Sequence, residues 1–227
     1  LAETLAYAGF DALTLDMQHG MGIGPDRAAT WLQAVSQTDT VPLVRVPWND
    51  PSYMQWVLDA GAYGVIVPLI GSREEAERAA GACRYPPVGF RSVGPNRVRN
   101  YAGTDYVDKA NEEIVCLVMV EHIDTIAELD DIAQVPGIDG FYIGPMDLAQ
   151  TMGLEPARYV SSKEHADACQ EVLDAAKRHG LVAGTHCGSP EEASKRFDQG
   201  FQLCPVLSDS RALAEAASDA LKVIREK

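Results

Sequence analysis

The sequence predicts an α/β protein that folds as a (βα)8 barrel, and two observations support this. Short runs of buried-type apolar residues alternate along the chain with longer segments that carry the signals of amphipathic helices. No repeat, linker or change of composition divides residues 1–227, so we expect a single (βα)8-barrel domain. Seven strands can be recognised. Because the chain opens on a helix, an eight-stranded barrel would need its first strand upstream of Leu1.

The first half of the chain has clear helix signals. Asp50 is an N-cap before proline at the first helical position, and Ser72 with Glu75 forms a capping box. A long loop rich in proline, glycine and arginine, 85–105, follows, and a loop of this length is usually functional. We expect helices over 1–8, 26–37, 51–61 and 72–84, and strands over Ala12–Asp16, Val41–Arg45 and Gly64–Val67.

The second half continues the alternation. Ser161 with Glu164 is expected to open a long helix that Gly180 closes, and Ser189 with Glu192 is expected to open the next one. The remaining strands are expected over Val115–Val120, Gly140–Ile143, 181–185 and 201–205, with further helices over 123–132 and 211–225. Helical crossovers between buried strands mean that the strands run parallel in one sheet.

Composition excludes several classes of protein. The chain is 46% hydrophobic and 23% charged, as in ordinary globular domains, and its net charge of −14 argues against nucleic acid or an anionic membrane as a partner. The start has no basic segment or cleavage site and no apolar run is long enough to span a bilayer, so we expect a cytoplasmic protein. The five cysteines are scattered without a CxxC pair, which favours free buried thiols.

The stretch GFYIGPMDL, residues 140–148, is the first candidate for a functional site. An apolar strand stops at Gly144 and Pro145, and the carboxylate of Asp147 follows at once, while the strand before it ends in Glu121. Two carboxylates at the carboxyl ends of successive parallel strands outline a divalent-cation site, and the amides of Met146 and Asp147 could hold a substrate carboxylate beside it. The alternative is that Asp147 only caps a helix and Glu121 is a charge at the rim.

Other strand ends add polar groups to the same face. The first visible strand ends in Asp16, with His19 three residues later, and the second ends in Arg45. Active sites of (βα)8 barrels lie at the carboxyl ends of the strands. A lone histidine is more often structural, and an arginine at a strand end is often only a surface ion pair. Their joint placement with two carboxylates favours an active site.

Five motifs in these segments resemble the HpcH/HpaI aldolase family, the metal-dependent class II pyruvate aldolases related to 2,4-dihydroxyhept-2-ene-1,7-dioate aldolase and 2-dehydro-3-deoxyglucarate aldolase. They occur in order over nearly the whole chain: LDMQHG at 15–20, VPLVRVPWNDP at 41–51, LDAGAYGVIVPLI at 58–70, RYPPVGFRSVGP at 84–95 and IGPMDLA at 143–149. The resemblance implies a TIM barrel of the phosphoenolpyruvate/pyruvate type. It also implies a homo-oligomer, from dimer to hexamer, with a swapped C-terminal helix.

The resemblance implies roles for the ligands of a divalent cation and for the groups around it. Glu121 and Asp147 would bind Mg, Mn or Co, with water and pyruvate completing the shell, so that the reaction passes through a metal-bound pyruvate enolate. Arg45 would bind the keto oxygen. The Gly144–Pro145–Met146–Asp147 turn would hold the pyruvate carboxylate.

The proton chemistry is likewise implied by the resemblance. His19 would be the general base, acting through water. Asp59 would raise its basicity, and Asp16 would orient the same water network. Two positions depart from the family pattern and bear on substrate preference. Gln18 stands where relatives commonly have glutamate, and Met119 stands where they commonly have glutamine.

The expected reaction is reversible aldol cleavage of a 4-hydroxy-2-oxo acid to pyruvate and an aldehyde. Two alternatives remain: an oxaloacetate-decarboxylase-like lyase that uses the same site, and a non-catalytic barrel that binds oxo acids. Arg91 and Arg97, in the long loop, either contact an acidic acceptor or are simply solvated. The last expected helix carries one apolar stripe, which either faces the barrel or, by resemblance, packs on a neighbouring subunit: Leu213, Ala216, Ala217, Ala220, Leu221 and Ile224.

Overall fold

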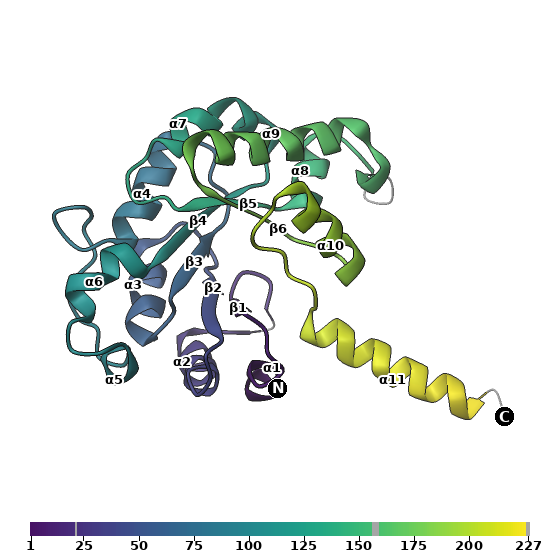
Figure 1. The fold of residues 1–227 in the computed structure, drawn as a ribbon, viewed down its shortest axis with the longest axis horizontal. Helices are drawn as coiled ribbons and strands as arrows, with labels where there is room; N and C mark the ends of the chain where they lie inside the picture. Colours follow the sequence, from purple (N-terminus) through teal and green to yellow (C-terminus); the bar gives the residue numbers. More distant parts are fainter. Residues whose placement is uncertain (21, 156–158, 226–227) are drawn as a thin grey trace.

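Six parallel strands form one sheet that curls around its own inner face, with helices packed on the outside (Figure 1). The structure is a computed structural model, and it describes residues 1–20, 22–155 and 159–225. The strands follow the order of the chain across the sheet: β1 (Ala12–Asp16), β2 (Val41–Arg45), β3 (Gly64–Val67), β4 (Val115–Val120), β5 (Gly140–Ile143) and β6 (Val182–Thr185). The expected α/β fold with a parallel sheet is confirmed. A closed barrel of eight strands is not.

The helices mostly begin at the caps that the sequence indicates. Side chains of Asp50, Ser72 and Ser189 each accept an amide hydrogen bond at a helix start, and Gly61, Gly180 and Gly200 end three helices in the left-handed conformation. The α-helices are α1 (Ala2–Ala6), α2 (Pro25–Val35), α3 (Pro51–Ala60), α4 (Arg73–Cys83), α5 (Arg99–Ala102), α6 (Tyr106–Glu113), α7 (Leu129–Ala133), α8 (Pro145–Thr151), α9 (Lys163–His179), α10 (Pro190–Gln199) and α11 (Asp209–Arg225). The 3-10 helices are η1 (Ile123–Glu128) and η2 (Tyr159–Ser161).

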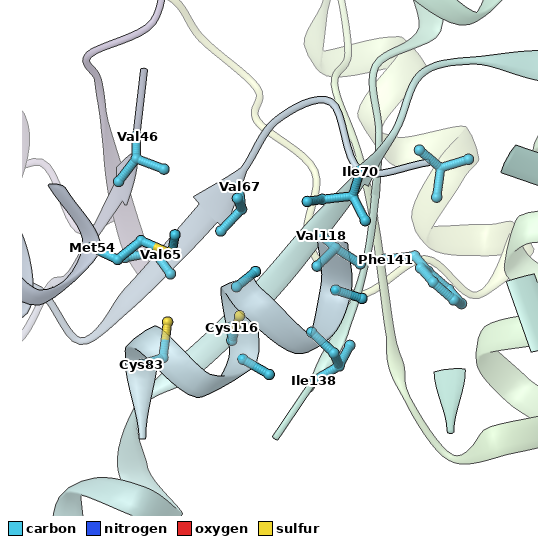
Figure 2. Packing of buried hydrophobic residues seen from close by; sticks show 14 of the residues in the cluster. Val46, Met54, Val65, Val67, Ile70, Cys83, Cys116, Val118, Ile138 and Phe141 are labelled. Atoms are coloured by element: carbon cyan, nitrogen blue, oxygen red, sulfur yellow. The ribbon is translucent and has the colours of Figure 1, made fainter. Parts of the chain in front are cut away.

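Two apolar clusters lie on opposite faces of the sheet. The larger one fills the space between the strands and the outer helices, and it includes Val65 and Val67 of β3, Met54 of α3 and Cys83 of α4 (Figure 2). The smaller one, on the inner face, consists of Ile66, Leu117, Met119 and Tyr142. Alternate residues of each strand therefore point to the inner face, as the period of two requires.

Three sequence-based expectations differ from the structure. Segment 201–205 was expected as a strand, but only Leu203 pairs, by one parallel bridge to Gly184. The loop 85–105 contains the short helix α5, and α6 follows it. The cap of α9 is Ser162, whose side chain accepts the amide of His165, and not Ser161. The cap differs because Ser161 and Ser162 offer equivalent local signals and tertiary packing chooses between them.

The C-terminal helix α11 projects from the body of the molecule (Figure 1). None of its residues is buried, so its apolar stripe does not face the barrel within the chain. All five cysteines are free and buried, as expected. Among the described helices, none combines the length and apolarity needed to cross a membrane.

Candidate active site

Three of the predicted site residues lie on the inner face at the carboxyl ends of their strands. Asp16 pairs with Arg45 in the register of β1 and β2. Glu121 follows β4 and continues the alternation of Leu117 and Met119, both of which belong to the inner cluster. Because parallel strands end at the same edge of the sheet, the fold brings these three charged groups to one end of the curled sheet.

Asp16 and Arg45 form a two-point ion pair. The Nε and Nη2 atoms of Arg45 donate to the two carboxylate oxygens of Asp16 at 2.9 and 2.5 Å. Burial alone would raise the pKa of Asp16, but the hydrogen bonds and charge of Arg45 lower it overall. Burial alone would lower the pKa of Arg45. The hydrogen bonds and the negative charge of Asp16 outweigh burial and raise the pKa of the guanidinium. Both groups are therefore charged at neutral pH, and the guanidinium is fixed in orientation.

Glu121 is a buried carboxylate with one backbone donor. The amide of Leu69 donates to its Oε1 at 2.6 Å. Leu69 has a φ of 57°, a left-handed conformation that is unfavourable for leucine and that aims this amide at the carboxylate. Burial raises the pKa of Glu121. The negative charge of Asp147 acts in the same direction, whereas the Leu69 amide, Arg45 and His19 act in the opposite one.

Asp147 reaches the site from the first turn of α8. The first intrahelical hydrogen bond runs from the Leu148 amide to Gly144, so the amides of Met146 and Asp147 have no acceptor within the helix. Gly144 packs directly against Glu121, since a Cβ atom there would lie 2.9 Å from Glu121 Oε2. Only a residue without a side chain allows the turn this close to the carboxylate.

His19 follows β1 on a loop that Asp16 organises. The amides of Gln18 and His19 both donate to Asp16 Oδ1, at 3.0 and 3.2 Å. The side chain of His19 is exposed, and its charge influences Glu121. The structure therefore brings together Asp16, His19, Arg45, Glu121 and Asp147, all of which sequence analysis proposed.

Asp59 lies away from His19 within the chain, so the role that the resemblance implied for it stays a prediction. It lies in the last turn of α3, which leads to the amino end of β3, whereas His19 follows the carboxyl end of β1. Its Oδ1 accepts a 2.7 Å hydrogen bond from Nη2 of Arg91, whose side chain is fully buried and also stacks on Tyr85. Asp59 is thus the counter-ion of a buried arginine.

Arg91 and Arg97 are not simply solvated, because both donate hydrogen bonds to groups within the protein. Arg97 donates to the carbonyl oxygen of Ala60 at 2.6 Å and to the hydroxyl of Ser36 at 2.7 Å. The two arginines of the long loop therefore attach it to the helices around α3. Their partners are distant in sequence, which is why sequence reasoning alone did not predict these contacts.

Sequence analysis missed two residues of the inner face, Tyr142 and His186. Tyr142 on β5 is buried, and burial raises the pKa of its phenol while the nearby charge of Arg45 lowers it. His186 follows β6 directly, and Arg45 and Asp16 are among the charges that act on its ring. The alternation of Val182, Gly184 and position 186 was the signal that could have identified this histidine.

Comparisons with known proteins identify the family of the chain. Residues 1–216 match the family model described as HpcH/HpaI aldolase/citrate lyase. The chain is 38% identical over 216 residues to a hydroxypyruvate/pyruvate aldolase of Rhizorhabdus wittichii, with 95% of this chain and 86% of that protein covered. It is 34% identical over 215 residues to a 5-keto-4-deoxy-D-glucarate aldolase of Escherichia coli, with 91% and 80% covered.

Solved structures show the same relationship. A HpcH/HpaI aldolase/citrate lyase family protein of Burkholderia cenocepacia superposes with a TM-score of 0.89 at 32% identity, over 99% of this chain and 89% of that one. A HpcH/HpaI aldolase of Desulfitobacterium hafniense gives 0.92 at 26% identity, over 100% and 88%. The comparisons thus identify an aldolase. The chain belongs to the HpcH/HpaI aldolase/citrate lyase family, and it is a carbon-carbon lyase of the pyruvate aldolase class.

Proposed function

We propose that this enzyme cleaves a 4-hydroxy-2-oxo acid reversibly to pyruvate and an aldehyde, with a divalent cation as cofactor. The observation that supports it most is the arrangement of Glu121 and Asp147 beside the guanidinium of Arg45 at the carboxyl edge of the sheet. Aldol cleavage leaves a pyruvate enolate, and a fixed cation beside its oxygen is the group that such a reaction needs.

Glu121 and Asp147 are the residues that would hold the cation. Burial is the largest cause that raises the pKa of Glu121, and the negative charge of Asp147 adds to it, so a cation between the two carboxylates would remove a repulsion. Oxygen ligands suit Mg, Mn or Co. In the described part of the chain no three His, Cys, Asp or Glu side chains gather as a metal site, so water and substrate would supply the other ligands. When bound, the cation supplies Lewis acidity at the keto oxygen of the substrate.

Arg45 would bind that keto oxygen. Asp16 fixes its guanidinium through Nε and Nη2, which leaves Nη1 and the second N–H of Nη2 to meet the substrate. During cleavage the bond between C3 and C4 breaks, its electron pair moves toward the keto oxygen, and negative charge grows there. Arg45 stabilises that charge without reorientation, because Asp16 already holds it.

His19 would take the proton of the C4 hydroxyl group, through a water molecule, as that carbon becomes the aldehyde. Its loop is fixed to Asp16, the same carboxylate that orients Arg45. The amides of Met146 and Asp147, which have no acceptor within α8, would hold the pyruvate carboxylate, with Gly144 and Pro145 shaping the turn. In the reverse direction the enolate attacks the aldehyde and His19 returns the proton.

The apolar stripe of α11 supports assembly into a homo-oligomer. Leu221 and Ile224 are 50% and 67% exposed, although both lie on the apolar face of the helix. We propose that this face packs on a neighbouring subunit, giving a dimer or a higher oligomer. Light scattering should show a mass of at least two chains, and Leu221→Lys should reduce it; a monomeric wild type would contradict this proposal.

A substrate panel tests the reaction itself. The enzyme is supplied in turn with Mg, Mn and Co, and pyruvate release from several 4-hydroxy-2-oxo acids is compared with carbon dioxide release from oxaloacetate. We expect metal-dependent pyruvate release that a chelator abolishes. Carbon dioxide release without any aldol cleavage would assign the site to a decarboxylase instead. If the enzyme released neither pyruvate nor carbon dioxide, only a binding function would remain.

A further inference from the structure

His186 is held on the inner face at the same level as Glu121 and Gly144. Its amide donates to the carbonyl oxygen of Ile143 at 3.2 Å, which continues the parallel pairing of β5 with β6 by one residue. Two residues earlier, a Cβ atom at Gly184 would meet Tyr142 Cδ2 at 2.8 Å, so this side of the strand faces the inner cluster. The side chain of His186 therefore points into the space above that cluster.

His186 and Glu121 both lie within electrostatic reach of Arg45. Those that act on its ring are Arg45, Glu192 and Asp16, whereas those that act on Glu121 are Asp147, Arg45 and His19. Arg45 is common to both sets. A substrate whose keto oxygen is bound by Arg45 therefore lies within reach of both the carboxylate pair and His186.

The imidazole of His186 is available to a ligand. Among the residues that the structure describes, none forms a hydrogen bond with either of its ring nitrogens, and solvent reaches the side chain. Burial lowers the pKa of the ring, and the charge of Arg45 adds to this, so the ring is neutral at pH 7. A neutral imidazole offers one donor and one acceptor, which matches a hydroxyl group better than a carboxylate or an alkyl group.

We propose that His186 binds the part of the substrate that leaves as the aldehyde, and that it selects aldehydes carrying a hydroxyl group next to the carbonyl carbon. This inference rests on the aldol reaction proposed above. The pyruvate half already has partners in Arg45, the carboxylates and the amides of α8. His186 follows the strand next to the α8 turn, at the same edge of the inner face, and is a polar group that none of these roles uses.

Two aldehydes of equal size test the proposal. Hydroxyacetaldehyde and propionaldehyde differ by a hydroxyl group in place of a methyl group, and each is added to pyruvate by the enzyme with saturating metal. The measured quantity is the ratio of their kcat/KM values, in which a general loss of activity cancels. We expect His186→Leu to lower the preference for hydroxyacetaldehyde by about tenfold, and His186→Gln to restore part of it.

A matched control is His179→Leu, which removes a partly buried histidine of α9 that binds Asp130, and its ratio should equal that of the wild type. If His186→Leu does not fold by circular dichroism, His186→Ala provides the same comparison. An unchanged ratio in the folded His186 variant would overturn the role of His186 and leave the proposed function standing. Absence of aldol product with every aldehyde in the wild type would refute the proposed function itself, and this inference with it.

Discussion

The carboxylate of Asp16 joins the guanidinium of Arg45 to the loop that carries His19. Its two oxygens accept from Arg45 at 2.9 and 2.5 Å, and Oδ1 also accepts the amide of His19 at 3.2 Å. One side chain thus orients both the group that would stabilise the enolate and the segment that would provide the base. This relationship explains why a residue that need not touch the substrate lies at the centre of the site.

Asp16→Asn should therefore misplace two groups at once. The amide keeps the shape of the side chain, but it cannot accept both hydrogen bonds from Arg45. Because small displacements of reacting groups are costly, we expect kcat for aldol cleavage to fall about a hundredfold. Asp11→Asn, an exposed change just before the same strand, is the control and should leave kcat unchanged. Wild-type kcat in Asp16→Asn would show that the ion pair is not needed for the reaction.

Glu121→Ala should abolish metal uptake and activity together. The carboxylate contributes half of the proposed protein ligands, and Asp147 alone offers one exposed group. Equilibrium dialysis with Mn measures uptake, and pyruvate release measures activity. Glu74→Ala, which removes an exposed carboxylate from the first turn of α4, serves as the control. Full Mn binding by folded Glu121→Ala would remove Glu121 from the ligand set.

Asp59→Ala should destabilise the protein. The change leaves the charge of Arg91 buried without its carboxylate partner, and breaking a buried ion pair typically costs about 3 kcal/mol or more. Urea unfolding measures the loss. Asp198→Ala on the surface of α10 should change the free energy of unfolding by less than about 0.5 kcal/mol. Wild-type stability of Asp59→Ala would show that Arg91 does not depend on this pair.

His165 links α9 to the turn at the active site and makes stability depend on pH. Its Nε2 donates to the carbonyl oxygen of Pro145 at 2.9 Å, since a carbonyl can only accept. Burial lowers the pKa of His165; Arg196 acts in the same direction, and the Pro145 carbonyl and Glu192 oppose it. The unfolded chain therefore binds more protons than the folded one just below the usual histidine pKa of about 6.5.

The free energy of unfolding should accordingly fall as the pH drops from 7 to 5. In His165→Gln, whose amide can still donate to Pro145, this fall should be smaller. Urea unfolding at several pH values provides the comparison. Parallel curves for the two proteins would show that His165 does not titrate with folding.

The strands were predictable because their signal is local. Five of the six strands, among them Gly64–Val67 and Gly140–Ile143, have the predicted bounds, since each is a short apolar run between turn residues. Helix α6 was missed because its sequence, YVDKANEE, is mostly polar and follows a long irregular loop. Segment 201–205 resembles a strand in sequence, but only Leu203 finds a partner.

The candidate site was predictable where residues end strands and not where contacts are distant in sequence. Asp16, Arg45 and Glu121 could be placed because parallel strands share an edge. The pairing of Asp59 with Arg91 spans thirty-two residues of chain and depends on how the long loop folds. Sequence analysis did not consider His186, which follows the predicted strand 181–185; the register of β6 with β5 places it on the inner face.

The most direct test of the account compares Arg45→Ala with His19→Ala in two reactions, with metal saturating. Decarboxylation of oxaloacetate forms pyruvate enolate without a general base, whereas aldol cleavage needs both groups. Arg45→Ala should lose both reactions by about a hundredfold to a thousandfold. His19→Ala should keep most of the decarboxylation while aldol cleavage falls by about a hundredfold to ten-thousandfold. Undiminished decarboxylation in Arg45→Ala, or equal loss of decarboxylation in the two variants, would contradict the division of roles between Arg45 and His19.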